Sequence, residues 1–136
     1  MKVENNQIIL KNIDNFITSL NDESDNRSIV IVEGKKDIEA LCYLGYNGKI
    51  KAYHHYRGIT CFIDRCANNY NKLILLLDSD RNGEAITRKI LLHLNGRNID
   101  LNYKKRLQEI TNWNIKKIEE IKSFYMGLSE NKSSKI

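Results

Sequence analysis

Leu73-Ile74-Leu75-Leu76-Leu77-Asp78-Ser79-Asp80 is the stretch of sequence that decides the fold. Five consecutive apolar residues between asparagine-rich and polar segments predict a strand buried on both faces, which is typical of the centre of a parallel sheet. Asp78 and Asp80 are two residues apart, so an extended chain points both carboxylates to the same side. Ligands of open α/β sheets bind at the carboxyl ends of the strands. The pattern therefore predicts divalent-metal ligands where this strand turns into a helix.

A second apolar run, residues 29–32, also ends in a carboxylate, Glu33, followed by Gly34. If the two strands are neighbours, Glu33, Asp78 and Asp80 converge on one point. Three carboxylate oxygens suit Mg²⁺, which prefers oxygen ligands. Acidic residues are also common at helix starts, where they accept hydrogen bonds from free amides. Spacing alone leaves metal ligands and helix caps as equal alternatives.

The remaining pattern alternates helices and strands, which predicts an α/β fold with a four-stranded parallel sheet in three layers. Because the acidic residues can converge only if the first and third strands are adjacent, we expect the strand order 2-1-3-4. The division predicted is an N-terminal helix and loop (residues 1–26), a central domain (27–101) and a basic helical tail (102–136). We expect helices over residues 8–20, 37–44, 59–70 and 84–95, strands over 29–32, 49–54, 73–77 and 98–101, and two tail helices within 103–128, broken near residue 112.

Composition narrows the classes of protein. The sequence has no apolar run of membrane-spanning length and no signal-peptide pattern near its start, so we expect a cytoplasmic location and no membrane partner. Three cysteines without paired spacing imply no disulfide framework. A zinc site built from Cys61, Cys66, His54 and His55 is less favoured than buried apolar cysteines.

Charge is uneven along the chain. Residues 81–136 contain 12 Lys and Arg against 6 Asp and Glu, whereas residues 1–80 contain 10 against 11. A basic half next to an acidic corner fits a polyanion held near a metal, with solvated surface lysines as the alternative.

The two strand ends together resemble the Toprim domain. That family is shared by type IA and type II topoisomerases, bacterial-type primases, the 5S rRNA maturation nuclease and small stand-alone proteins. The matching motifs are a strand ending in Glu33-Gly34 and a strand ending in Asp78-x-Asp80 followed by Gly83; Gly58 matches a further family position only loosely. The likeness covers about residues 27–101 and is greatest to small archaeal stand-alone Toprim proteins.

The resemblance implies a Rossmann-like Toprim fold, with Mg²⁺, or alternatively Mn²⁺, bound by Glu33, Asp78 and Asp80. It also implies phosphodiester cleavage or transfer, in which these carboxylates are catalytic and Glu33 can move a proton. We expect nucleic acid as the partner, RNA more than DNA, within a protein complex or a dimer. The expected phosphate-binding residues are the cations nearest the strand ends: Lys35, Lys36, Arg57, Arg81 and Arg88. For all of them except Arg57, a solvated surface position is an equal alternative.

Whether the protein is an enzyme stays open from the sequence. The leading prediction is an RNA-processing nuclease or phosphotransferase, and the alternatives are a non-catalytic RNA- or DNA-binding module and a metal-stabilised scaffold. Residues 104–106 are more simply a solvated basic helix face. Trp113 could stack on a base, but a lone tryptophan between two helices more often packs them together.

Overall fold

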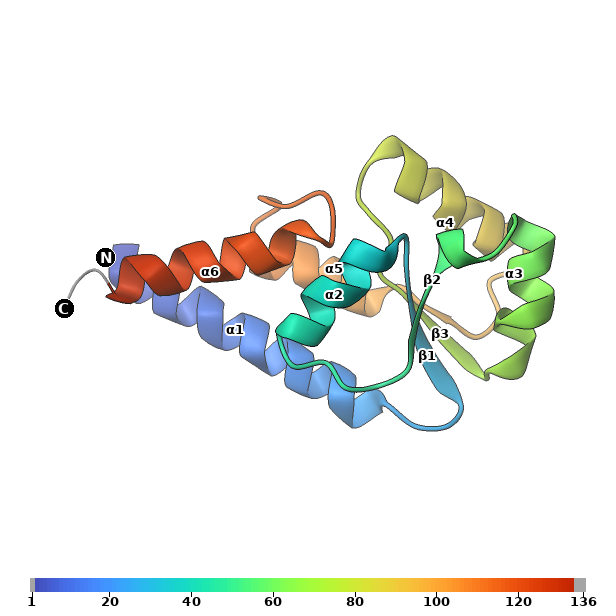
Figure 1. Ribbon diagram of the computed structural model, residues 1–136, viewed down its shortest axis with the longest axis horizontal. Helices are drawn as coiled ribbons and strands as arrows, with labels where there is room; N and C mark the ends of the chain where they lie inside the picture. The colour runs from blue at the N-terminus through green and yellow to red at the C-terminus, as the bar shows by residue number, and fades with distance from the viewer. Residues whose placement is uncertain (1, 134–136) are drawn as a thin grey trace.

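The computed structural model describes residues 2–133, with side chains from 5 to 130. Its centre is a sheet of four parallel strands, β1 (Ser28–Val32), β2 (Ile50–Ala52), β3 (Lys72–Leu75) and β4 (Ile99–Asp100), in the order β2-β1-β3-β4 (Figure 1). The α/β class and the strand order expected from the sequence are confirmed. None of the described helices is long and apolar enough to cross a membrane.

The two central strands are apolar because helices cover both of their faces. Every residue of β1 is buried, and its register with β3 pairs Ile31 with Leu75. Alternate side chains point to opposite faces of the sheet, so each strand contributes to two separate cores. This register places the carboxyl ends of β1 and β3 next to each other.

Helices form the outer two layers (Figure 1). One face is covered by α1 (Lys2–Glu23), α2 (Lys35–Tyr43), α5 (Asn102–Ile110) and α6 (Glu120–Ser133), and the other by α3 (Ile59–Arg65) and α4 (Arg81–His93). Leu77 belongs to the α3 and α4 core although it follows the last ladder residue of β3. The apolar run thus extends the buried region past the strand itself.

Several predicted elements have other bounds than their sequence patterns suggest. The strands expected over residues 73–77 and 98–101 are Lys72–Leu75 and Ile99–Asp100, and the helix expected over 8–20 runs from Lys2 to Glu23. Two further elements are shorter than expected. The strand expected over residues 49–54 ends at Ala52, and a 3-10 turn (Tyr53–His55) follows. The strand stops because its only neighbour, β1, ends at Val32, opposite Ala52. The helix expected over residues 59–70 ends at Arg65 and is followed by a 3-10 turn at Ala67–Asn69.

The C-terminal region contains two helices, but the second begins later than the sequence suggested. Ile115 and Ile118 were expected on that helix and are buried in the irregular segment 111–119 instead. Carboxylates hold the backbone there: Glu120 Oε1 accepts the N–H groups of Lys116 and Lys117, each at 2.8 Å. Helices α5 and α6 pack against α1. The division of the chain at residues 26 and 101 stays a prediction, and residues 134–136 of the predicted tail lie outside the described residues.

Candidate metal centre

Three carboxylates meet at the carboxyl ends of the two central strands. One side-chain oxygen from each of Glu33, Asp78 and Asp80 lies within 4.8 Å of the others. Glu33 follows β1 directly, Asp78 lies three residues beyond β3, and Asp80 immediately precedes α4. The convergence expected from two distant stretches of sequence is therefore present.

Asp80 also caps helix α4. Its Oδ1 accepts the N–H of Gly83 at 2.8 Å, as N-cap carboxylates do. A side chain at residue 83 would collide with the backbone N, C and O of Asp78, so glycine is the residue that lets helix and strand end approach each other. Asp80 is thus both a helix cap and a member of the carboxylate cluster, the two roles that the sequence left as alternatives.

Asp78 is a buried carboxylate, with 5% of its surface exposed. Its Oδ1 accepts the backbone N–H of Ile118 at 2.9 Å. Burial, together with repulsion from Asp37, Glu33 and Asp80, raises the pKa of Asp78 to about 7, although the hydrogen bond from Ile118 opposes the rise. A cation at the cluster would favour the charged form.

Glu33 has one oxygen with a partner and one without. Its Oε2 accepts a hydrogen bond from Asn82 Nδ2 at 3.0 Å and lies 3.6 Å from His54 Nε2. Its Oε1 is buried and, within the part of the chain that the structure describes, has no hydrogen-bond partner. Leaving a buried acceptor unsatisfied is unfavourable. A hard divalent cation next to Asp78 and Asp80 would satisfy it, so the donor set fits Mg²⁺ or Mn²⁺.

Residues from other elements support the cluster, and sequence reasoning missed them. Lys104 of α5 donates from Nζ to the carbonyl oxygen of Asp78 at 3.2 Å, and burial lowers the pKa of Lys104. Gln108 donates to Ser79 Oγ at 2.7 Å. Lys104 was expected on a solvated face, and no local pattern could connect it with a strand 26 residues earlier. The i, i+4 spacing of Lys104 and Gln108 on one helix face was the only available signal.

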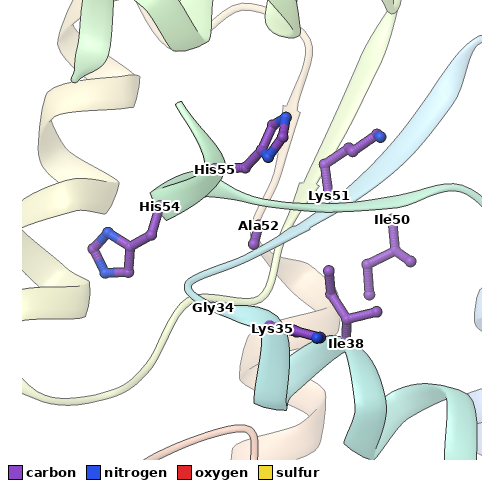
Figure 2. Close-up of a pocket in the computed structure, with 8 residues that line it drawn as sticks. All are labelled: Gly34, Lys35, Ile38, Ile50, Lys51, Ala52, His54 and His55. Atoms are coloured by element: carbon purple, nitrogen blue, oxygen red, sulfur yellow. The ribbon is translucent and has the colours of Figure 1, made fainter. Parts of the chain in front are cut away.

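A hollow of about 420 Å³ lies beside the cluster at the β2 edge of the sheet. Figure 2 shows its lining: Ile38 and Ile50 lie next to each other, while His54 and Lys51 lie at opposite ends and point away from one another. His54 joins this hollow to the cluster through its approach to Glu33. The two lysines of the lining, Lys35 and Lys51, do not point toward a common centre (Figure 2).

The five cations expected to bind phosphate come from three parts of the chain: α2, the segment before α3, and α4. All five are exposed. Lys35 lines the hollow of Figure 2, and Arg88 lines a second hollow between α4 and α5. Lys36 faces a shallow depression against α6, beside Glu119 and Glu120. Arg57 and Arg81 line neither of these hollows, and phosphate binding by the five residues stays a prediction.

The alternative zinc site loses its support. Cys66 is buried in the α3 and α4 core, and burial raises the pKa of its thiol, which keeps the sulfur protonated. His54 is directed to Glu33 instead. Trp113, expected to pack two helices together, is 60% exposed, so that expectation was wrong.

Comparison with known proteins agrees with this geometry. The model of the Toprim domain matches residues 28–113, which include all three carboxylates. A UPF0292 protein from Archaeoglobus fulgidus is 33% identical over 116 residues, covering 83% of this chain and 89% of that protein. A UPF0292 protein from Thermococcus onnurineus is 34% identical over 99 residues, covering 71% and 73%. A solved structure of a protein from Aquifex aeolicus is 31% identical, with a TM-score of 0.63 over 78% of this chain and 94% of that one.

Proposed function

The chain belongs to the Toprim domain family, and on this premise we propose that it is a Mg²⁺-dependent protein that cleaves phosphodiester bonds during RNA processing. Membership of the family implies a divalent-metal-binding protein that acts on nucleic acid. The choice of RNA, of Mg²⁺ and of cleavage is our proposal. One observation carries it: Glu33, whose buried Oε1 has no hydrogen-bond partner among the described residues, belongs to the same cluster as Asp78 and Asp80.

Glu33, Asp78 and Asp80 would hold the cation. When bound, a divalent ion stabilises developing charge on a phosphate and lowers the pKa of an attacking water or hydroxyl group. Asp78 would lend its second oxygen, since Oδ1 is engaged by the Ile118 N–H. Asp80 would bind while still capping α4.

The chain's own groups would orient the reaction. Asn82 and His54 fix the Oε2 side of Glu33, so Oε1 is presented to the site and can accept or return a proton. Lys104 holds the backbone carbonyl of Asp78 and Gln108 holds the side-chain hydroxyl of Ser79. Lys35 and Arg88, from the two hollows, would contact phosphates on either side, and the exposed Lys36, Arg57 and Arg81 would add to the positive field.

A non-catalytic RNA- or DNA-binding module is the second candidate. It is favoured by the location of the surplus positive charge, which lies in residues 81–136 and not among the residues around Glu33. Such a module would retain nucleic acid with a steep dependence on salt and no chemistry.

An assay with labelled single-stranded and structured RNA, and matched DNA, separates the two candidates. We expect cleavage of RNA in Mg²⁺ and none in EDTA. Asp78→Asn and Asp80→Asn should reduce cleavage to the EDTA level, because each removes a charge while the amide oxygen can still accept the Ile118 or Gly83 N–H. Asp64→Asn, at an exposed position of α3 outside the cluster, is the control and should cleave normally.

The proposal has clear contrary outcomes. Salt-sensitive RNA retention without cleavage in Mg²⁺ or Mn²⁺ would establish the binding module instead. Cleavage that survives both Asn variants would exclude the cluster as the catalytic site.

A further inference from the structure

A second hollow, of about 450 Å³, lies between α4 and α5. Its lining includes three cationic side chains, Arg88, Lys104 and Lys105, against one carboxylate, Glu84. Trp113 forms part of the same wall. A hollow with surplus positive charge and an exposed aromatic ring fits a ligand that is both anionic and planar.

Trp113 is held in an unusual conformation. Asn112 and Trp113 both have positive φ angles, 53° and 61°. The left-handed region is unfavourable for a bulky side chain, which normally leaves it to glycine or asparagine. The N–H of Trp113 donates to the carbonyl of Gln108 at 2.9 Å, which fixes the turn after α5. Strained backbone that keeps a large aromatic side chain exposed is typical of a functional position.

The hollow borders the carboxylate cluster. Lys104 and Gln108, which both line it, donate to Asp78 and Ser79. The segment that carries Trp113 is also fastened there, because Ser79 N–H donates to the carbonyl of Lys116 at 2.6 Å. A chain bound along the hollow would thus lead directly to the proposed metal.

We propose that this hollow binds single-stranded nucleic acid, with Trp113 stacked on an unpaired base and Arg88 and Lys105 contacting the flanking phosphates. The inference rests on the proposed action on nucleic acid and adds the preference for a single strand. A paired base has both faces covered by its neighbours in the helix, so only an unpaired or splayed base can stack on an exposed ring.

Intrinsic tryptophan fluorescence can follow the stacking of a base on Trp113, because Trp113 is the only tryptophan in the sequence. The probe is a 12-nucleotide oligouridylate titrated into the full chain in EDTA, where metal-dependent cleavage is absent. We expect tryptophan fluorescence to be quenched in step with binding, measured in parallel by anisotropy of the labelled strand. An RNA duplex of the same length should produce little quenching.

Variants then test the two components of the hollow. Trp113→Ala should weaken single-strand binding roughly 5- to 150-fold, the range expected from losing one base stack, while Trp113→Phe should recover most of it. Tyr43→Ala is the matched control, since Tyr43 is also an exposed aromatic residue, at 52%, but lies on α2. Arg88→Gln should weaken binding and lower the salt slope by about one; Lys89→Gln, its exposed neighbour outside the hollow, should change neither.

Four results would overturn the inference. The first is saturable binding of the oligonucleotide without quenching, the second is unchanged affinity in Trp113→Ala, and the third is the absence of any binding. The fourth is equal quenching by duplex RNA, by free uridine monophosphate or by polyglutamate, which would identify a different ligand. Trp113-dependent binding without cleavage would uphold the hollow and refute the nuclease, so the two proposals fail separately.

Discussion

The connections from β1 into α2 and from β3 into α4 are built alike but use their aspartates differently. We call them the β1 turn (residues 33–37, which include the first turn of α2) and the β3 turn (residues 76–80). Each contains one buried aspartate that accepts a backbone N–H from the segment before α6: Asp37 Oδ1 from Glu119 at 2.8 Å and Asp78 Oδ1 from Ile118 at 2.9 Å. Asp37 uses its second oxygen for the N–H of Gly34 at 2.9 Å. Asp78 leaves its second oxygen to the cluster with Glu33 and Asp80. Hydrogen-bond saturation therefore separates a structural carboxylate from a candidate ligand.

Glycine substitutions should produce the largest difference between the two turns, measured as the loss in free energy of unfolding. Gly83→Ala places a methyl group against the Asp78 backbone, and we expect it to lower the free energy of unfolding by about 3 kcal/mol or more. Gly34→Ala is the matched change. Its Cβ would approach no closer than 4.0 Å to Asp37 Oδ2, and its extended backbone suits alanine, so the effect should stay within about 1 kcal/mol. Urea denaturation measures both, and equal losses would contradict the distinction.

Aspartate substitutions should divide stability from metal binding. Asp37→Ala leaves two N–H groups without their acceptor, which should cost about 2–3 kcal/mol of stability. Below its unfolding transition this variant should still bind Mn²⁺ in calorimetry. Asp80→Asn should keep its stability, since asparagine is an equally good cap, and should lose the metal. A variant pair that lost both properties together would show that the turns are not separable.

Magnesium should stabilise the native chain through the β3 turn. At ten times the dissociation constant, a ligand specific to the folded state adds about 1.4 kcal/mol, seen as a rise in Tm. Glu33→Gln and Asp80→Asn should show no rise, whereas Asp64→Asn should match the unmodified chain. A rise of equal size in all four proteins would indicate nonspecific ion binding.

The smallest expected effect is the pH dependence of that rise. Because the pKa of Asp78 is raised to about 7 in the fold, its contribution to metal-free stability is full below its ordinary pKa near 3.8 and is lost as the pH rises through 7. Mg²⁺ needs the charged form, so the Mg²⁺-induced rise in Tm should be smaller at pH 6 than at pH 8. Asp80→Asn should keep the metal-free pH trend without the Mg²⁺ response, and a response independent of pH would exclude Asp78 as a ligand.

The sheet and the carboxylate cluster could be predicted because each depends on local patterns. Buried strands appear as apolar runs, and the acidic residues at their ends implied that β1 and β3 are neighbours. The lengths of the strands were harder to predict. Tyr53 and His54 continue the β2 pattern in sequence, but the ladder between β1 and β2 ends at the pair Val32 and Ala52.

What the sequence could not provide was contact between distant segments. The approach of Lys104 to Asp78 and of Glu119 to Asp37 joins residues that no periodicity relates. The exposure of Trp113 accompanies positive φ angles at Asn112 and Trp113, and tryptophan is not a residue type that predicts one. A lone tryptophan is ordinarily buried, so composition favoured the wrong environment.

The hydrogen bonds from residues 118 and 119 to the two turns determine where the chain can be truncated. The region matched by the family model ends at residue 113, before both N–H donors. A fragment trimmed to that boundary would open Asp37 and Asp78 to water and shift their protonation. Removing residues 114–136 would thus alter the carboxylate cluster itself. Truncated variants used to study the cluster should therefore keep the residues up to the start of α6.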